Sequence, residues 1–178
     1  MSQRNRGLVL LAIQLMLVLS IAGKYVYERK VCPRVWVRTA QFDPNLVLRG
    51  RYVALQLAVD ACALPHNLGD LLGPHSSGIW KWRVKPDAKD GRLVAVPAAD
   101  DARPELTQDL IQSVNQPCSR AVLSPSADYF IGDRAKSPFP LKPGEELWAE
   151  VTIPPSGPPR PIQLAISSNA GFKPIVVR

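Results

Sequence analysis

The sequence predicts a mostly β domain, sandwich- or barrel-like, with antiparallel or mixed strands and one short helix, preceded by a single N-terminal transmembrane helix. Three observations carry this prediction. Hydrophobic residues make up 46% of the 178-residue chain, which is enough for a packed core and excludes global disorder. Eighteen prolines against eleven glycines favour short strands joined by stiff turns over a helix bundle. All the prolines follow residue 32, and an uncharged apolar run precedes them.

The apolar run covers residues 8–23 and contains two polar side chains, Gln14 and Ser20. It is slightly shorter than the roughly 20 residues needed to cross a hydrocarbon core about 30 Å thick. Lys24 can extend its ammonium group toward lipid headgroups, and residues 25–27 add the aromatic character of a membrane interface. The run therefore predicts a membrane-spanning helix whose partner is the lipid bilayer.

Two fates of this segment are compatible with the sequence. A signal peptide cleaved after Ala22 is one, because Ser20 and Ala22 supply small residues at the required positions. The length of the run favours the other, an uncleaved anchor. A short tail with two arginines and a large following domain favour an N-terminus inside the cytoplasm. We predict a cytoplasmic tail at residues 1–6, a transmembrane signal anchor at 7–27, a juxtamembrane segment with the first strand at 28–40 and an extracytoplasmic β-rich domain at 41–178.

The net charge of +7 is distributed unevenly along the chain. Residues 1–38 carry seven basic side chains and one acidic side chain, whereas residues 39–178 carry fifteen basic and fourteen acidic ones. A nucleic-acid-binding protein needs its positive charge on the folded surface, where it neutralises phosphates. Here the excess surrounds the apolar run instead, which indicates membrane topology and no nucleic-acid partner.

Alternation of apolar and polar side chains predicts the strands. Residues 34–38 place Val35 and Val37 on one face and Trp36 on the other. Residues 51–60 form the clearest strand, with an inward face of Val53, Leu55, Leu57 and Val59. Further strands are predicted at residues 79–84, 92–96, 146–153, 162–166 and 174–177.

Two local signals refine this pattern. Asp90-Gly91, between two predicted strands, is typical of a tight hairpin. Residues 146–153 place Trp148 outward and an apolar set inward, namely Leu147, Ala149, Val151 and Ile153.

One helix is predicted at residues 104–116. Pro104 suits a first helical position, and Leu106, Leu110 and Val114 recur every four residues. Pro117 would end the helix.

Residues 42–57 resemble the signature of the GDYXXLXY family, bacterial membrane-anchored proteins of unknown biochemical function. Arg51 departs from the Asp of that signature, and Leu57 departs from its closing Tyr. Residues 128–131 resemble a later Tyr-Phe-Val segment of the family. The matching positions of the signature are Asp43, Pro44, Arg49, Gly50, Tyr52 and Leu55.

The resemblance implies a bacterial inner-membrane protein with a single span, a β-rich periplasmic domain and, often, a polytopic membrane partner. It implies no reaction. Physically, Asp43-Pro44 opens a turn, and Gly50 permits a positive φ just before a strand. We expect a non-catalytic cell-envelope module that acts with another membrane protein; the alternative is an extracytoplasmic ligand-binding or hydrolytic domain, soluble if the signal segment is cleaved.

Three cysteines, Cys32, Cys62 and Cys118, fit no metal or redox motif of the Cys-x-x-Cys type. Outside the cytoplasm two of them can pair, and Cys62 with Cys118 is the favoured pair because Cys32 lies next to the membrane. Three free cysteines remain the alternative.

Other candidate sites have simpler structural explanations. His66, Asp70 and His75 could ligate a metal, but glycines and prolines surround them, so loop histidines are favoured and no metal or cofactor is expected. A nucleophile pair of Cys62 and His66 has no further support.

Two last candidates are weaker. Lys136-Ser137 with Ser124 or Ser126 is interpreted as turn sequence beside proline, so no catalytic residue is predicted. Trp80 and Trp82 share one strand face, and a core role is favoured over stacking on a sugar or peptide.

Overall fold

The computed structural model describes residues 3–40, 52–64, 79–99, 103–113, 115–130 and 140–175. The chain divides into two compact units, Met1–Cys32 and Pro33–Arg178. The second unit begins at Pro33 rather than at residue 41. The first strand is therefore part of the β domain and not of a juxtamembrane segment.

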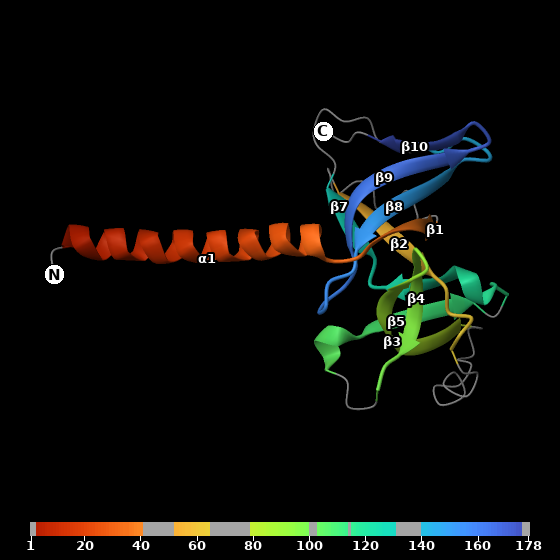
Figure 1. The fold of residues 1–178 in the computed structure, drawn as a ribbon, viewed down its shortest axis with the longest axis horizontal. Helices are drawn as coiled ribbons and strands as arrows, with labels where there is room; N and C mark the ends of the chain where they lie inside the picture. Colours follow the sequence, from red (N-terminus) through yellow and green to blue (C-terminus); the bar gives the residue numbers. More distant parts are fainter. Residues whose placement is uncertain are drawn as a thin grey trace. The chain divides into compact units, whose positions relative to one another are not determined.

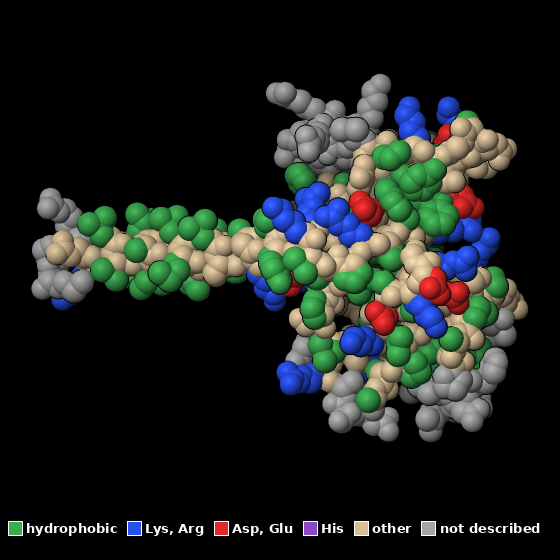
Figure 2. Space-filling view, viewed as in Figure 1, with side chains coloured by type: hydrophobic (Ala, Val, Ile, Leu, Met, Phe, Trp, Pro, Cys, Tyr) green, Lys and Arg blue, Asp and Glu red, His purple; other side chains and the backbone are tan. Residues whose placement is uncertain are grey.

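The first unit consists of one α-helix, α1 (Gln3–Val31), of 29 residues and about 44 Å. Residues Asn5–Val31 are long and apolar enough to cross a membrane. The large apolar side chains from Leu8 to Val26 are 45–72% exposed, and Figure 2 shows them along α1. The helix agrees with the predicted span and extends it at both ends.

The second unit is a curled antiparallel sheet, a half-barrel, which confirms the predicted β class (Figure 1). Its order is β10-β9-β8-β1-β2-β6-β5-β3-β4, and β7 also pairs with β2. Within the described residues the strands are β1 (Arg34–Ala40), β2 (Tyr52–Val59), β3 (Ile79–Lys89), β4 (Arg92–Pro97), β5 (Gln108–Ser113), β6 (Ala121–Ser124), β7 (Ala127–Phe130), β8 (Glu146–Thr152), β9 (Arg160–Ser168) and β10 (Gly171–Ile175).

The sheet curls far enough for β4, its last strand, to meet the end of β2. The Asp60 N–H donates to the carbonyl of Leu93 at 3.0 Å, and the Ala95 N–H donates to the carbonyl of Asp60 at 2.9 Å. These two backbone hydrogen bonds satisfy groups that an open edge strand would leave unpaired. Strands β2, β6, β5, β3 and β4 thus form a closed end, whereas β1, β8, β9 and β10 form an open end.

The core consists of the inward side chains of these strands, and the predicted faces are confirmed. All four inward residues of β2 are at most 6% exposed. Val35 and Val37 of β1 are buried beside them, as is the inward set of β8, Leu147, Ala149 and Val151, with Ile153 just beyond it. The period of two therefore identified which face of each strand meets the core.

The predicted hairpin at Asp90-Gly91 is also confirmed. Both residues have positive φ, 51° and 73°, and Lys89 pairs with Arg92 across the two-residue turn. Positive φ at both central positions matches the right-handed twist of the flanking strands. Strand β3 continues to Lys89, beyond the predicted end at residue 84.

The predicted helix at residues 104–116 is wrong. Pro104–Leu106 form one short 3₁₀ turn, η2, and β5 follows. Leu110 is completely buried and pairs with Trp82 of β3 and Leu123 of β6. Pairing on both sides satisfies the backbone of β5, and this tertiary context outweighs a spacing of three apolar residues.

Candidate functional site

The family-like signature lies mainly outside the described residues. Asp43, Pro44, Arg49 and Gly50 fall there, whereas Tyr52 begins β2. Leu55 is 1% exposed and belongs to the core. Its place in the signature is therefore explained by packing.

The two family-like segments are neighbours in the sheet although they are far apart in sequence. Strand β7 pairs with the first half of β2, so that Tyr52 faces Phe130 and Leu55 faces Ala127. Strand β6 pairs with the second half, with Ala58 facing Val122. Leu55 and Ala58 are three residues apart in β2, whereas their partners Ala127 and Val122 are five residues apart. Pro125 lies in the segment between these two partners. The sequence reading did not recognise β6 and β7 because each is only four residues long.

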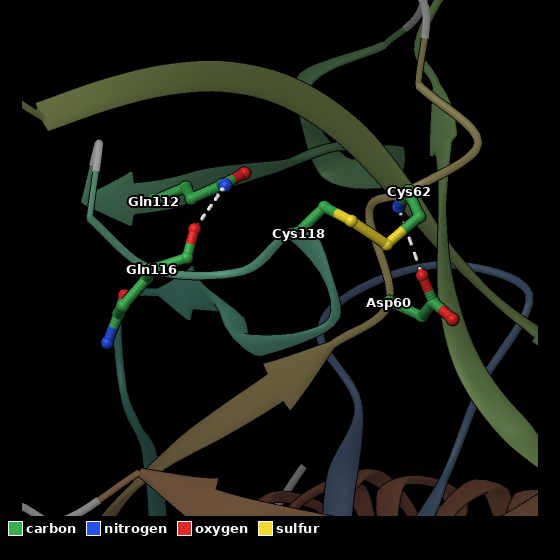
Figure 3. Close-up of a disulfide and its surroundings, with 5 residues drawn as sticks. All are labelled: Asp60, Cys62, Gln112, Gln116 and Cys118. Carbon is green, nitrogen blue, oxygen red and sulfur yellow. Dashed lines mark hydrogen bonds between the residues drawn. A yellow bond between two sulfur atoms is a disulfide. The ribbon is translucent and has the colours of Figure 1, made fainter.

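The structure joins Cys62 and Cys118 by a disulfide, the pair that the sequence favoured (Figure 3). The bond links the end of β2 to the short 3₁₀ turn η3 (Cys118–Arg120) that precedes β6. Two hydrogen bonds hold this junction. The Cys62 N–H donates to the Asp60 carboxylate at 3.0 Å, and the Ala61 N–H donates to the Cys118 carbonyl at 3.1 Å. The disulfide therefore ties the closed end two residues beyond Asp60, the residue to which β4 returns. Cys32 is a free cysteine.

A cavity of about 480 Å³ opens beside this junction. That volume suits a small molecule. Its walls come from β1, β2, the segment that carries η3 and the loop that leads into β8. The described lining residues are Arg38, Thr39, Ala58, Gln116, Arg120, Leu141, Gly144, Glu145, Glu146 and Leu147.

Two of the four charged side chains in the cavity wall, Arg38 and Glu146, form an ion pair with each other. Arg38 Nη2 lies 2.6 Å from Glu146 Oε1, and the Glu145 carboxylate accepts the Lys142 N–H at 3.0 Å. Arg120 is exposed and makes no ion pair with any residue that the structure describes. The wall therefore holds one cation without an ion-pair partner among the described residues, Arg120, together with the Glu145 carboxylate.

An aromatic cluster, Trp36, Trp148 and Phe172, covers the outer face of the open end. The Phe172 ring meets Trp36 edge-on at 4.8 Å and Trp148 at 6.2 Å between centroids. Ala165 of β9 pairs with Trp148 and is completely buried, although it lies on the outer face. Figure 2 shows a hydrophobic patch over this end of the sheet, with charged side chains at its edge.

Alternation in the sequence predicts outward faces for Trp36 and Trp148 but does not predict that they lie close together. Their strands are separated by more than a hundred residues, and Phe172 lies on a third strand. No sequence signal marked Phe172. Only the order β1-β8-β9-β10 places these three rings on one surface.

The core interpretation of Trp80 and Trp82 agrees with the structure for Trp82 only. The two rings are stacked, 6.1 Å apart between centroids and nearly parallel. Trp82 packs against the buried core, and both side chains are partly buried. The indole nitrogen of Trp82 is buried and makes no hydrogen bond within the described residues.

Most of the remaining candidate residues lie outside the part of the chain that the structure describes. His66, Asp70, His75, Lys136 and Ser137 lie outside the described residues. Ser124 and Ser126 flank Pro125; Ser126 lines a second cavity of about 360 Å³ whose wall includes several prolines. In the part of the chain that the structure describes, no three metal-ligating side chains come together.

The class of protein that these observations define is a β half-barrel domain with an N-terminal helix able to span a membrane. Comparison with known proteins adds no closer relationship. The chain matches no protein-family model, no curated protein and no solved structure at a significant level.

Proposed function

We propose that this chain is a single-pass membrane protein of the cell envelope whose β domain acts, without catalysis, in contact with another membrane protein. The observation that carries the anchor is the exposure of α1. Its large apolar side chains are 45–72% exposed from Leu8 to Val26. Leaving such surface in water costs roughly 25 cal/mol per Å², whereas a bilayer covers it.

The disulfide supports a location of the β domain outside the cytoplasm. Disulfides persist in oxidising compartments such as the bacterial periplasm and are rare in reducing ones. Cys62 and Cys118 are joined, and the bond closes a loop with a sequence separation of 56 residues. A reduced pair would lose this constraint on the unfolded chain.

Charge and resemblance support the finer assignment to the bacterial inner membrane. Arg4 and Arg6 precede the apolar run and no acidic residue does, which favours an N-terminus in the cytoplasm. The similarity of residues 42–57 to the GDYXXLXY signature favours a bacterial envelope protein with a periplasmic domain and a polytopic partner.

The contact surface that we assign to the β domain is the aromatic cluster. Aromatic side chains are enriched at the centres of protein interfaces, where they contribute much of the binding energy. Phe172 is 46% exposed and is supported from beneath by Trp36 and Trp148. The cluster therefore provides a preformed apolar contact surface surrounded by polar side chains.

Two measurements test this function. Intact mass of the membrane-bound chain, together with resistance to alkaline extraction, tests the anchor; release of a chain lacking residues 1–22 would contradict it. Affinity capture from detergent-solubilised membranes tests the contact. We expect an integral membrane protein to be recovered with the wild type and to be lost with Phe172→Ala. Lys173→Ala, next along β10, is the matched control.

A second candidate function is binding of a small anionic ligand in the cavity beside the disulfide. The observation that favours it is Arg120, an exposed cation with no ion-pair partner among the described residues. Thermal stabilisation by small carboxylates or phosphates, lost in Arg120→Ala, would support this function. Equal behaviour of wild type and variant would contradict it.

A further inference from the structure

The apolar part of α1 contains two polar side chains, and their hydrogen bonding differs. The Ser20 hydroxyl donates to the Leu17 carbonyl at 2.8 Å, within the same helix. Gln14 is exposed on the helix surface and makes no hydrogen bond within the part of the chain that the structure describes. Ser20 is thus satisfied in a bilayer, and Gln14 is not.

Gln14 lies close to the middle of the apolar run. Six residues of the run precede it and nine follow it, which places it about 9 Å and about 14 Å along the helix from the two ends. Its side chain cannot reach the headgroups from there. The amide carries two N–H donors and a carbonyl acceptor, and leaving these unpaired in hydrocarbon is costly. The side chain therefore requires a polar partner at the same depth.

We propose that this partner is Gln14 of a second copy of the chain, so that two α1 helices associate side by side in the membrane. An amide both donates and accepts, and two such groups related by a two-fold axis satisfy each other. Two copies inserted with the same topology have Gln14 at the same depth in the bilayer. The two amides are therefore aligned without any further interaction. The inference rests on the proposed function in one respect, because the anchor must be retained.

The face of α1 around Gln14 suits such packing. Residues three, four and seven positions away lie on the same side of a helix and form the seam of paired helices. Gly7 lies on this face and has no side chain, which allows the backbone of a second helix to approach closely there. The other members of this face are uncharged and apolar: Leu10, Leu11, Leu17, Val18 and Ile21.

At the C-terminal end of α1, the same face carries a lysine whose charge is compensated by a glutamate of the same helix. Lys24 and Glu28 lie ten and fourteen residues beyond Gln14, and Lys24 Nζ is 3.8 Å from Glu28 Oε1. This i,i+4 pair partly compensates the Lys24 charge within the chain, because Glu28 is 7% exposed. The seam therefore contains an unsatisfied amide at its centre and no net charge at its end.

Self-association of the full-length chain in phosphatidylcholine vesicles tests the proposal. Cys32 is the free cysteine, so donor and acceptor fluorophores can be attached there without disturbing the disulfide. We expect energy transfer that increases with the ratio of protein to lipid. Gln14→Leu should weaken association about 3- to 30-fold, the range given by one interhelical hydrogen bond.

Two matched variants complete the experiment. Gln14→Asn keeps the amide and should retain most of the association. Ser20→Ala removes a hydroxyl that is bonded within its own helix and should leave association unchanged.

The following outcomes contradict the proposal. A monomeric wild-type chain in vesicles, or association that survives Gln14→Leu unchanged, removes the second copy as the partner. Cross-linking of position 14 in cell membranes to a different protein, with none to a second copy, assigns Gln14 to that protein instead. A purified chain whose mass shows loss of residues 1–22 overturns the anchor itself, whereas an intact but monomeric chain overturns this inference alone.

Discussion

The two ends of the sheet protect their outermost strands by different means. At the closed end, β4 shares backbone hydrogen bonds with Asp60, and the disulfide fixes the same junction. At the open end, β10 is a solvent-exposed edge strand that contains Pro174, which cannot donate a hydrogen bond to a further strand. The closed end is thus stabilised by chain constraints, and the open end by the aromatic cluster over its outer face.

One continuous sheet thus contains an end that is constrained by its own chain and an end with an exposed apolar outer surface. At the closed end the edge strand β4 pairs with the same chain at Asp60. The open end keeps an edge and an apolar outer surface, with Phe172 46% exposed. Four sets of substitutions test this distinction, in order of decreasing expected change in stability.

Replacing both Cys62 and Cys118 by Ala should destabilise the domain most. A disulfide with a sequence separation of 56 residues lowers the entropy of the unfolded chain, which corresponds to about 4 kcal/mol. Urea unfolding measures the loss. Hydrogen exchange should accelerate more in β2 and β6 than in β9 and β10. Cys32→Ser, which removes the free cysteine, is the control, and equal stability of all three proteins would contradict the prediction.

Leu110→Ala and Leu164→Ala compare the cores of the two ends with the same chemical change. Both leucines are completely buried, one in β5 and the other in β9. Each substitution should cost about 3 kcal/mol, because it removes buried methyl groups and leaves a cavity. Chemical denaturation measures both. A loss below about 1 kcal/mol for Leu164→Ala would show that the open end has no tightly packed core of its own.

Phe172→Ala tests the aromatic cover of the open end. The substitution removes two edge-to-face contacts and uncovers the outer face of β9, so we expect a loss of about 1–2 kcal/mol. Thermal unfolding and quenching of tryptophan fluorescence by iodide report stability and exposure separately. Lys173→Ala should change neither. Unchanged iodide quenching in Phe172→Ala would show that Phe172 does not shield the two indoles.

The ion pair of Arg38 and Glu146 should contribute least. Its side chains are 34% and 39% exposed, so water and salt screen the interaction strongly. A double-mutant cycle with Arg38→Met and Glu146→Gln should give a coupling of about 0.5 kcal/mol that decreases with added salt. A coupling above about 2 kcal/mol, independent of salt, would instead indicate a structural role in the cavity wall.

The local pattern of the sequence predicted much of this fold. The apolar run gave the helix, the period of two gave the buried faces of β1, β2 and β8, and Asp90-Gly91 gave the hairpin. These features depend on residues that are close together in sequence, and their burial follows from alternation alone. The favoured cysteine pair also agrees with the structure, although the sequence left three free cysteines open.

The predictions that were wrong or missing concern features that depend on pairing between distant strands. Leu106, Leu110 and Val114 have helical spacing, yet Leu110 is buried in a strand between β3 and β6. Strands β6 and β7 are too short to show alternation, and Pro125 separates them. No local pattern could show that Phe172 would cover Trp36 across the open end.

Local sequence patterns are enough to establish that a helix able to span a membrane precedes a β domain, and which face of each main strand is buried. Chain periodicity decides these properties because hydrophobic side chains must leave water on one side of each element. The tertiary structure decided that β4 returns to Asp60, that the two family-like segments pair, and that three aromatic rings meet over Ala165. These arrangements require the strand order of the whole sheet, which brings together residues that carry no mutual signal in the chain.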